Sequence, residues 1–446
     1  MKLIYDVKDK PNFSKCLVFS FQQVLAIITA TLAVPTIINN ICETSMDQAS
    51  ALFGAGVGTI IYLLFTKFRS PVFLGSSFAF IGSMCSAFAG ASTMALGYLG
   101  LIIGAILAGL VYAIISILVK KFGSDWINKL MPPIVIGPIV AIIGLSLSTN
   151  AIQDFTNGSG GSTYVAIACG LVTLFTTIIV STYSKKSLRL IPFIIGIFAG
   201  YIFACLFYFI GSISNNDALK VINFESLKNC FNEIKFSSFL SIPRFTFIES
   251  RGVFSELNIS YFITLITAYV PVAFVVFAEH IADHKNLSSI IEKDLLSDPG
   301  LNRTLLGDGI GSMLGAFFGG CPNTTYGESI GCVAITGNAS SITIVYAAIM
   351  CMLISFFTPF IAFLQTIPTC VMGGVCIALY GFIATSGLKI MQTVDLNDNK
   401  NMFVSSIILI TGVGGLVFNI GAIEIRTVAC ALILGIIANK VLSNKK

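Results

Sequence analysis

Residues 320–337 read GCPNTTYGESIGCVAITG and place a polar run in the middle of a very apolar chain. Pro322 and the polar residues after it interrupt a continuous helix. Non-helical backbone is tolerated at membrane depth only where protein buries it or where it lines a cavity. If the surrounding apolar runs span a membrane, this stretch marks a broken span beside a buried site.

The composition of the whole chain is that of a membrane protein. Of 446 residues, 55% are hydrophobic and 11% are charged, and the mean hydropathy is +0.91. A soluble domain carries about 25% charged residues. A spanning helix needs about 20 apolar residues, and the clearest runs are 18–38 and 97–119. We therefore predict an all-α polytopic protein in the lipid bilayer.

The remaining composition excludes several classes of function. The first apolar run lacks a convincing signal-peptide cleavage site, so we interpret it as the first span. The formal net charge of +5 reports topology rather than a nucleic-acid partner. The twelve cysteines form no metal-type or redox-type pair, and most lie in or beside apolar runs, where packing explains them. We expect no metal and no cofactor.

About fourteen apolar segments can be counted, and the third and tenth are short or interrupted. An even number puts both termini on one side. With the termini cytoplasmic, most of the 26 Lys and Arg residues fall inside the cell. Most of the exceptions share one external loop, roughly 214–258, and long loops follow the positive-inside rule least well. We predict a multi-pass protein of the cell membrane with cytoplasmic termini.

Two sequence echoes indicate an internal repeat. The stretch 131–145 resembles 367–381, and GSSFA at 75–79 resembles NTTYG at 323–327. An odd number of spans per repeat forces the second copy into the membrane upside down. The echoes therefore predict two inverted repeats of seven spans, an arrangement of secondary transporters whose site lies between broken helices.

The two interrupted segments predict how that site is built. Residues 75–77 and 321–325 would each run extended before a half-helix, one in span 3 and one in span 10. The half-helices would aim their N-terminal N–H groups at one central point, which suits carbonyl oxygens or anions. Phe78 and Tyr326 would lie beside that point, placed to stack on a flat ligand or to close the cavity.

Acidic residues within apolar runs are the other candidates, because charges at membrane depth are costly and usually functional. Glu279 and Asp283 are four residues apart and share one helix face. Glu328 follows the second break. A carboxylate there can take up a proton on one side of the membrane, release it on the other, and accept hydrogen bonds from ring N–H groups. Two carboxylates and two half-helix N-termini would complement a lactam ring.

Each of these polar residues has a plainer interpretation. Glu279 could end its span at the cytoplasmic water, Glu328 could cap a helix, and Lys285 could mark the membrane edge close to Asp283. For Asp308 a structural role is equally open. We expect the chain's two histidines to be interfacial; they are His280 and His284.

The chain resembles the bacterial uracil permeases of the nucleobase–ascorbate transporter (nucleobase:cation symporter-2) family nearly end to end. The matching stretches are LGSSFAFI (74–81), AEHI (278–281), KDLLSDPGLNRTL (293–305), FFGG-PNTTYGESIG (317–331), IPTCVMGGV (367–375) and LYGFIATSGLKI (379–390).

This resemblance implies a domain division and a transport function. A core domain would comprise spans 1–4 and 8–11, and a gate domain spans 5–7 and 12–14. The expected boundaries are 1–125 (core), 126–215 (gate), 216–258 (external loop), 259–366 (core) and 367–446 (gate). The core would move against the gate, commonly in a homodimer, and import a nucleobase together with a proton.

The resemblance also implies roles for individual residues. The carboxylates of Glu279 and Glu328 would hold the base, and Glu279 and Asp283 would carry the proton. The other expected substrate-binding positions are the backbone N–H groups of Phe78 and Gly327, the adjoining Ser77, and Tyr326 and Tyr380, which would line or close the site.

Three positions depart from the family pattern. Asp283 stands where the uracil permeases often carry a histidine, Gln23 where a histidine is common, and Ser329 where an asparagine is usual. An aspartate at position 283 can still carry a proton, although with a different pH response. Ser329 keeps a hydroxyl but lacks an amide, which alters the expected substrate network.

Other functions fit the residues less well. The purine and xanthine branch of the family generally has glutamine at position 328, whereas an ionised glutamate only accepts hydrogen bonds and suits the two ring N–H groups of uracil. A sulfate or bicarbonate exchanger would place its anion beside two carboxylates, which repel it. A channel would need a continuous polar pore. An enzyme is not indicated, because neither a nucleophile–base pair nor a cofactor motif is present.

Overall fold

The computed structural model describes residues 3–123, 132–184, 188, 191–232, 235, 238–420, 423–425 and 427–443. The expected domain boundary at 125–126 lies outside these described residues. In the first half of the chain the elements are α1 (Phe13–Cys42), α2 (Gln48–Phe65), β1 (Leu74–Ser76), η1 (Phe78–Phe80), α3 (Ile81–Ala89), α4 (Met94–Phe122), α6 (Pro133–Ser146), α7 (Ser148–Thr156), α8 (Thr163–Tyr183) and α9 (Pro192–Ile213).

A segment with short helical turns joins the halves, and long helices then resume. The joining elements are η3 (Asp217–Leu219), α10 (Glu225–Phe231), α11 (Thr246–Glu249) and η5 (Phe254–Glu256). The second half contains α12 (Ile259–Ile291), η6 (Leu296–Gly300), α13 (Leu301–Gly319), β2 (Asn323–Thr325), α14 (Gly327–Thr336), α15 (Ser341–Ile354), α16 (Thr358–Leu364), α17 (Thr369–Met391), α18 (Asn399–Val413), β3 (Phe418–Ile420), β4 (Ile423–Ile425) and α19 (Thr427–Ser443).

Within the described ranges, eight helices are long and apolar enough to cross a membrane. They are α1, α2, α4, the α6–α7 pair, α8, α9, α12 and α17. The ten residues of α14 give a length of only about 15 Å at 1.5 Å per residue, half of the hydrocarbon thickness. The prediction of a multi-pass helical membrane protein is confirmed.

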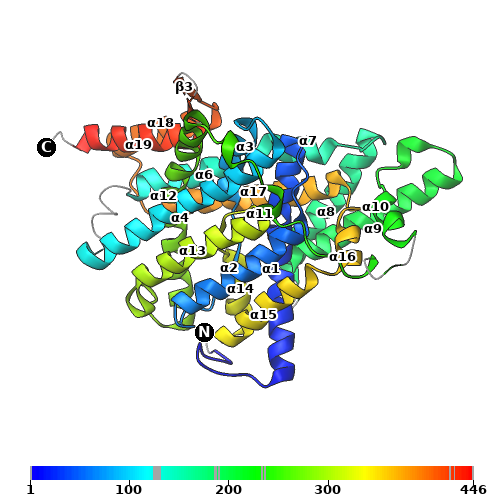
Figure 1. Ribbon diagram of the computed structural model, residues 1–446, viewed down its shortest axis with the longest axis horizontal. Helices are drawn as coiled ribbons and strands as arrows, with labels where there is room; N and C mark the ends of the chain where they lie inside the picture. The colour runs from blue at the N-terminus through cyan, green and yellow to red at the C-terminus, as the bar shows by residue number, and fades with distance from the viewer. Residues whose placement is uncertain are drawn as a thin grey trace.

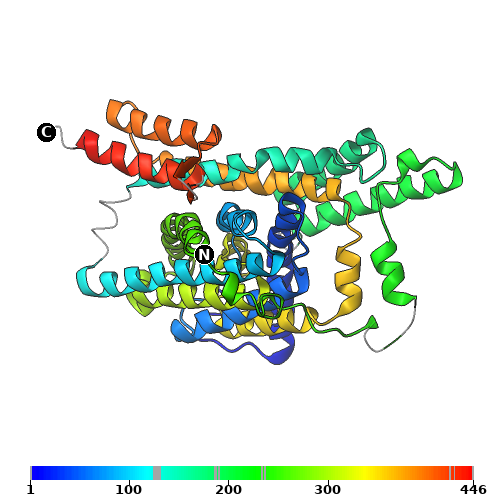
Figure 2. The ribbon, with the colours of Figure 1, turned by 45° about the horizontal axis from the view of Figure 1, so that its top comes forward.

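The helices form two groups on either side of α12. In one group α13 packs against α2 and α4, and α1 packs against α15 and α14; in the other, α17 packs against α6 and α8, and α18 against α19 (Figure 1). Figure 2 shows the orange and red helices α17–α19 above the cyan α4 and the yellow-green α13. Because α12 contacts α3 and α4 as well as α6 and α19, it lies where the two groups meet.

The polar stretch around Pro322 forms one strand of a two-stranded sheet inside the helices. β1 and β2 pair antiparallel, with Leu74 opposite Thr325 and Ser76 opposite Asn323. The backbone N–H of Ser77 donates to the carbonyl of Pro322 (2.9 Å), and that of Tyr326 donates to Phe73 (3.1 Å). The backbone N–H and C=O groups of the two interrupted segments therefore bond to each other, which an apolar environment requires. Because the strands are antiparallel, α3 and α14 leave the crossing in opposite directions.

Close packing holds this strand crossing in place. α13 ends at Gly319, and Gly320 adopts a positive φ of +74° that turns the chain toward β2. The ring of Tyr326 lies against Gly75, and its hydroxyl donates to the carbonyl of Ser76 (2.8 Å). Nearby, the Thr59 hydroxyl accepts from the N–H of Leu74 (2.9 Å). Neighbouring helices thus anchor both strands.

The segment predicted as an external loop, 216–258, packs on both helix groups. Val221 and Ile222 are buried in a cluster with residues of α8, α9 and α17. Further on, the rings of Phe245 and Phe247 pack with an aromatic cluster from α2 and α13; its members are Phe53, Phe317 and Phe318. A segment without a recognisable motif is therefore held by apolar contacts at both ends.

The fit between Gly75 and Tyr326 is directly testable. A β-carbon at Gly75 would overlap the Tyr326 ring, so we expect Gly75→Ala to lower the free energy of unfolding by about 1–3 kcal/mol through overpacking. A β-carbon at Gly82, on α3 after the same break, meets no atom within 4 Å. Gly82→Ala is the matched control and should leave the melting temperature of the purified protein unchanged. Equal melting temperatures for the two variants would contradict the packing described here.

Candidate functional site

A short helix begins at each end of the strand crossing, because each of the two antiparallel strands leads directly into one. η1 begins at Phe78 after β1, and α14 begins at Gly327 after β2. Neither N-cap residue, Ser77 or Tyr326, uses its side chain to cap the helix. Helix N-termini carry N–H groups without intrahelical partners and a partial positive charge. Each end of the crossing therefore offers backbone donors at the start of a helix.

Open space adjoins both half-helices. A β-carbon built on Gly327 or on Gly331, one turn further along α14, would meet no atom within 4 Å, and the same holds for Gly82 on α3. A cavity of about 220 Å³ borders Phe78 and Gly82, and residues of α1, α6, α7, α12 and α19 form its other walls. A small planar molecule could approach the backbone here without displacing a side chain.

Glu279 and Glu328 come from two different elements that contact each other. Glu279 lies on α12, Glu328 lies in the first turn of α14, and both are partly buried. The two carboxylates are within electrostatic reach of each other. Like charges at short range repel, so the pair favours a ligand that supplies hydrogen-bond donors between them, or a proton on one of them.

Asp283 lies one turn beyond Glu279 on α12 and faces the strand crossing. Its Oδ2 accepts a hydrogen bond of 2.7 Å from the hydroxyl of Thr325, the last residue of β2. Lys285, which the sequence offered as a mark of the membrane edge, is exposed. Thr325 was not singled out from the sequence; its place in the polar run after Pro322 was the available signal.

The aromatic candidates occupy different positions. Phe78 is partly buried and meets Tyr380 of α17 edge to face, with ring centroids 6.4 Å apart. This contact joins the two helix groups beside the half-helix N-termini. Tyr326 is only 4% exposed and is held between Gly75 and the carbonyl of Ser76. The Tyr326 ring therefore supports the strand crossing rather than facing open space.

Two of the departures from the family pattern meet in the structure. The hydroxyl of Ser329 accepts a hydrogen bond from the N–H of Phe73 (2.9 Å), and the amide of Gln23 donates to the carbonyl of Ser329 (3.3 Å). Ser329 thus secures the backbone at the entrance to β1. Ser77 is buried, and its hydroxyl has no hydrogen-bond partner among the described residues.

The prediction that both histidines are interfacial is wrong. His280 is 0% and His284 is 1% exposed. His280 contacts Asp308 (Nδ1 to Oδ2, 2.7 Å) and Thr304 (Nε2 to Oγ1, 3.0 Å) on α13. His284 contacts Tyr62 on α2, with Nε2 2.6 Å from the hydroxyl. The sequence could not show these partners, because they come from other helices.

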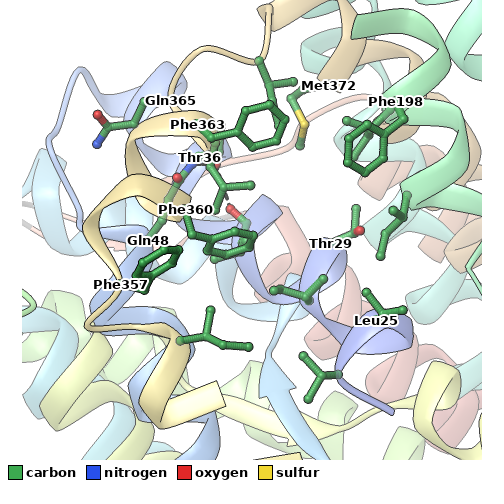
Figure 3. A pocket seen from close by; sticks show the side chains of 18 of the residues that line it. Leu25, Thr29, Thr36, Gln48, Phe198, Phe357, Phe360, Phe363, Gln365 and Met372 are labelled. Atoms are coloured by element: carbon green, nitrogen blue, oxygen red, sulfur yellow. Dashed lines mark hydrogen bonds between the residues drawn. The ribbon is translucent and has the colours of Figure 1, made fainter. Parts of the chain in front are cut away.

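The largest cavity described lies elsewhere. It encloses about 630 Å³ between α1, α9, α16 and α17, and Figure 3 shows the aromatic side chains of Phe198, Phe357, Phe360 and Phe363 around it. Neither Glu279 nor Glu328 lines it. Among the described residues no cluster of three or more His, Cys, Asp or Glu side chains could hold a metal ion. The polar candidate residues therefore lie around the strand crossing and on α12, away from this cavity.

Solved structures with the same fold are transporters. The transmembrane domain of the cyanobacterial bicarbonate transporter BicA matches 97% of this chain and all of that domain, with a TM-score of 0.59 and 14% identity. The murine Solute Carrier 26 family member A9 anion transporter matches 98% of this chain and 69% of that protein, with a TM-score of 0.62 and 12% identity. At such identities the likeness concerns the fold alone.

Curated relatives of higher identity cover the whole length. The uracil permease of Bacillus caldolyticus is 35% identical over 100% of this chain and 96% of that protein. The uracil permease of Escherichia coli K12 is 35% identical over 96% of this chain and 92% of that protein. A family model described as the permease family, whose name refers to xanthine and uracil permeases, matches residues 14–420. The chain therefore belongs to this permease family, together with the bacterial uracil permeases.

Proposed function

We propose that this protein is a proton-coupled secondary transporter that imports uracil across the cell membrane. The observation that carries the proposal is Glu328 in the first turn of α14, within electrostatic reach of Glu279 on α12, next to a strand crossing from which two short helices leave in opposite directions. The curated relatives named as uracil permeases, 35% identical over nearly the whole chain, support the choice of substrate.

Uracil is a flat ring with two N–H donors and two carbonyl acceptors. The carboxylates of Glu279 and Glu328 would accept from the ring N–H groups, which they can do when ionised. The backbone N–H groups of Phe78 and Gly327, at the positive ends of the half-helices, would donate to the carbonyl oxygens. Phe78 and Tyr380 would flank the ring, and Ser77 and Tyr326 would contribute through the backbone of the crossing.

Alternating access would use the two helix groups. We assign α1–α4 and α12–α15 to a core domain and α6–α9 and α17–α19 to a gate domain, with fourteen spans in two inverted repeats of seven and broken spans 3 and 10. The contact between Phe78 and Tyr380 joins the groups beside the site and would open and close as the core moves. A homodimer and cytoplasmic termini complete the proposed arrangement.

Glu279 and Asp283 would carry the proton. Both lie on the face of α12 turned toward the crossing, and Asp283 is bonded to Thr325 of β2. A change of charge at Asp283 would therefore act directly on the broken span that binds the base. Such a link between proton and substrate is what coupled transport requires.

Two related functions fit the site less well. A purine or xanthine permease is favoured by glutamine at position 328, whereas this chain has Glu328. Anion transport, the activity named for the solved structures of this fold, would place an anion between two carboxylates. The uptake experiments test both of these alternative functions.

Removing each carboxylate separates substrate binding from proton coupling. We expect Glu328→Gln to weaken uracil binding at least tenfold, about 1.4 kcal/mol, because an ionised acceptor is lost. We expect Glu279→Gln to abolish gradient-driven uptake. Glu225→Gln, in the segment between the halves, is the control and should behave as the wild type. Binding is measured by isothermal titration calorimetry and uptake in proteoliposomes; wild-type values for both site variants would refute the assignment.

The bond between Thr325 and Asp283 gives a second prediction. Thr325→Val removes the hydroxyl that donates to Asp283 and leaves a buried carboxylate oxygen without this partner, so the melting temperature and the rate of uptake should both fall. The neighbouring Thr324 carries a buried hydroxyl without a hydrogen-bond partner among the described residues. Thr324→Val should therefore be neutral or stabilising. A thermal melt in which Thr324→Val is the more damaging change would contradict this reading.

A further inference from the structure

The geometry of His280 and Asp308 requires a proton between the two side chains. The hydroxyl of Thr304 donates to the carbonyl of Leu301 (3.1 Å), so it accepts from Nε2–H of His280. Nδ1 of His280 then lies 2.7 Å from Oδ2 of Asp308. Without a proton between these atoms, a lone pair would face a carboxylate. With one, the buried pair is neutral overall, which an environment of low polarity favours.

His284 is held in one uncharged form. Its Nδ1 lies 2.8 Å from the carbonyl oxygen of His280, which can only accept, so Nδ1 carries a hydrogen. Its Nε2 lies 2.6 Å from the hydroxyl of Tyr62. A second proton on this ring would create a charge at a position that is 1% exposed and stacked 4.0 Å from the ring of His280. For the uncharged ring to accept at Nε2, the hydrogen of the Tyr62 hydroxyl must point to Nε2 rather than to Ser70 Oγ, which lies 2.7 Å from the same oxygen and competes for that hydrogen.

Among the residues that the structure describes, the groups around His284 offer no separate counter-ion. Tyr62 and Ser70 approach it from α2 and the turn after it, with Ser70 Oγ 3.4 Å from Nε2. From α13 the acidic group is Asp308, which already pairs with His280. On α12 itself the neighbouring acid is Asp283, which is bonded to Thr325. The charged and titratable groups nearby are thus engaged elsewhere.

These contacts also fix the rotation of α12. His280 and His284 each follow directly after a carboxylate of the proposed site, Glu279 and Asp283. Successive residues of an α-helix point about 100° apart, so anchoring the two rings on α2 and α13 turns the two carboxylates toward β2 and α14. A change in this anchoring would misplace both acids together.

We propose that His280 and His284 are positioning residues: a neutral, hydrogen-bonded connector that sets the orientation of Glu279 and Asp283 and carries no transported proton. Histidine is the side chain whose charge ordinarily changes between about pH 5 and pH 8, so a histidine next to a proposed proton site is itself a candidate proton carrier. The geometry assigns them the opposite role. The proposal deepens the transport function above, and its first test does not depend on it.

The first test is ¹⁵N NMR of the protein labelled with [¹⁵N]histidine. The chain contains two histidines, so two sets of ring signals are expected, and the one lost in His284→Gln identifies His284. We expect His284 to show a hydrogen on Nδ1 and none on Nε2. Both rings should keep their protonation from about pH 5 to pH 8. A ring that gains or loses charge within this range would overturn the proposal, whatever the substrate.

The second test uses variants and rests on the proposed uptake. His284→Gln can still accept from Tyr62 and should retain most activity, whereas His284→Phe and Tyr62→Phe should lower the maximal rate by about tenfold, the scale of one unsatisfied buried polar group. The pH at half-maximal uptake should stay unchanged in all three. Tyr261→Phe is the control, because that buried hydroxyl donates to the carbonyl of Ala87 (2.7 Å) away from the histidines. A shifted pH midpoint in Tyr62→Phe, absent from Tyr261→Phe, would show that the connector carries protons.

Discussion

The pairing of β1 with β2 is the interaction on which the rest of the structure depends. Backbone groups that leave a helix inside a membrane have no water to bind, so each break needs a partner within the protein. Here the two interruptions are each other's partner: three residues on each side pair as strands, and the bonds from Ser77 to Pro322 and from Tyr326 to Phe73 extend the pairing at both ends. The same pairing fixes the opposite directions in which α3 and α14 leave the crossing.

Two faces of α12 have different roles: one carries acids of the candidate site, and the other holds the helix against its neighbours. On one face, Asp283 is bonded to Thr325 of β2; the adjacent face is bonded through His280 and His284 to α13 and α2. The supporting helices pack through small residues: a β-carbon at Gly58, for example, would lie 2.7 Å from the carbonyl oxygen of Gly311. Such close contacts between backbones favour movement of α2, α4 and α13 as one body. The acids would then move relative to α17 without losing their orientation.

The sequence predicted where the helices are interrupted, because glycine, proline and hydroxyl residues inside an apolar run disfavour a continuous helix. It also indicated the carboxylates, since charge at membrane depth is costly. It could not pair β1 with β2, whose residues are far apart in the chain, nor show that Tyr326 is enclosed by Gly75. His280 and His284 were misplaced for the same reason, because their partners Asp308 and Tyr62 reach them from α13 and α2. Local sequence patterns thus pointed to the candidate residues, whereas contacts between distant segments decided how those residues are arranged.

The most direct test of the central claim is uptake of labelled uracil into proteoliposomes, first with an inward proton gradient and then with the gradient collapsed. Unlabelled xanthine and uridine serve as competitors. The account predicts uptake that requires the gradient and that unlabelled uracil, but neither competitor, blocks. Uptake indifferent to the gradient would contradict proton coupling through Glu279 and Asp283. Absence of uracil uptake together with transport of xanthine would contradict the substrate assigned to the site.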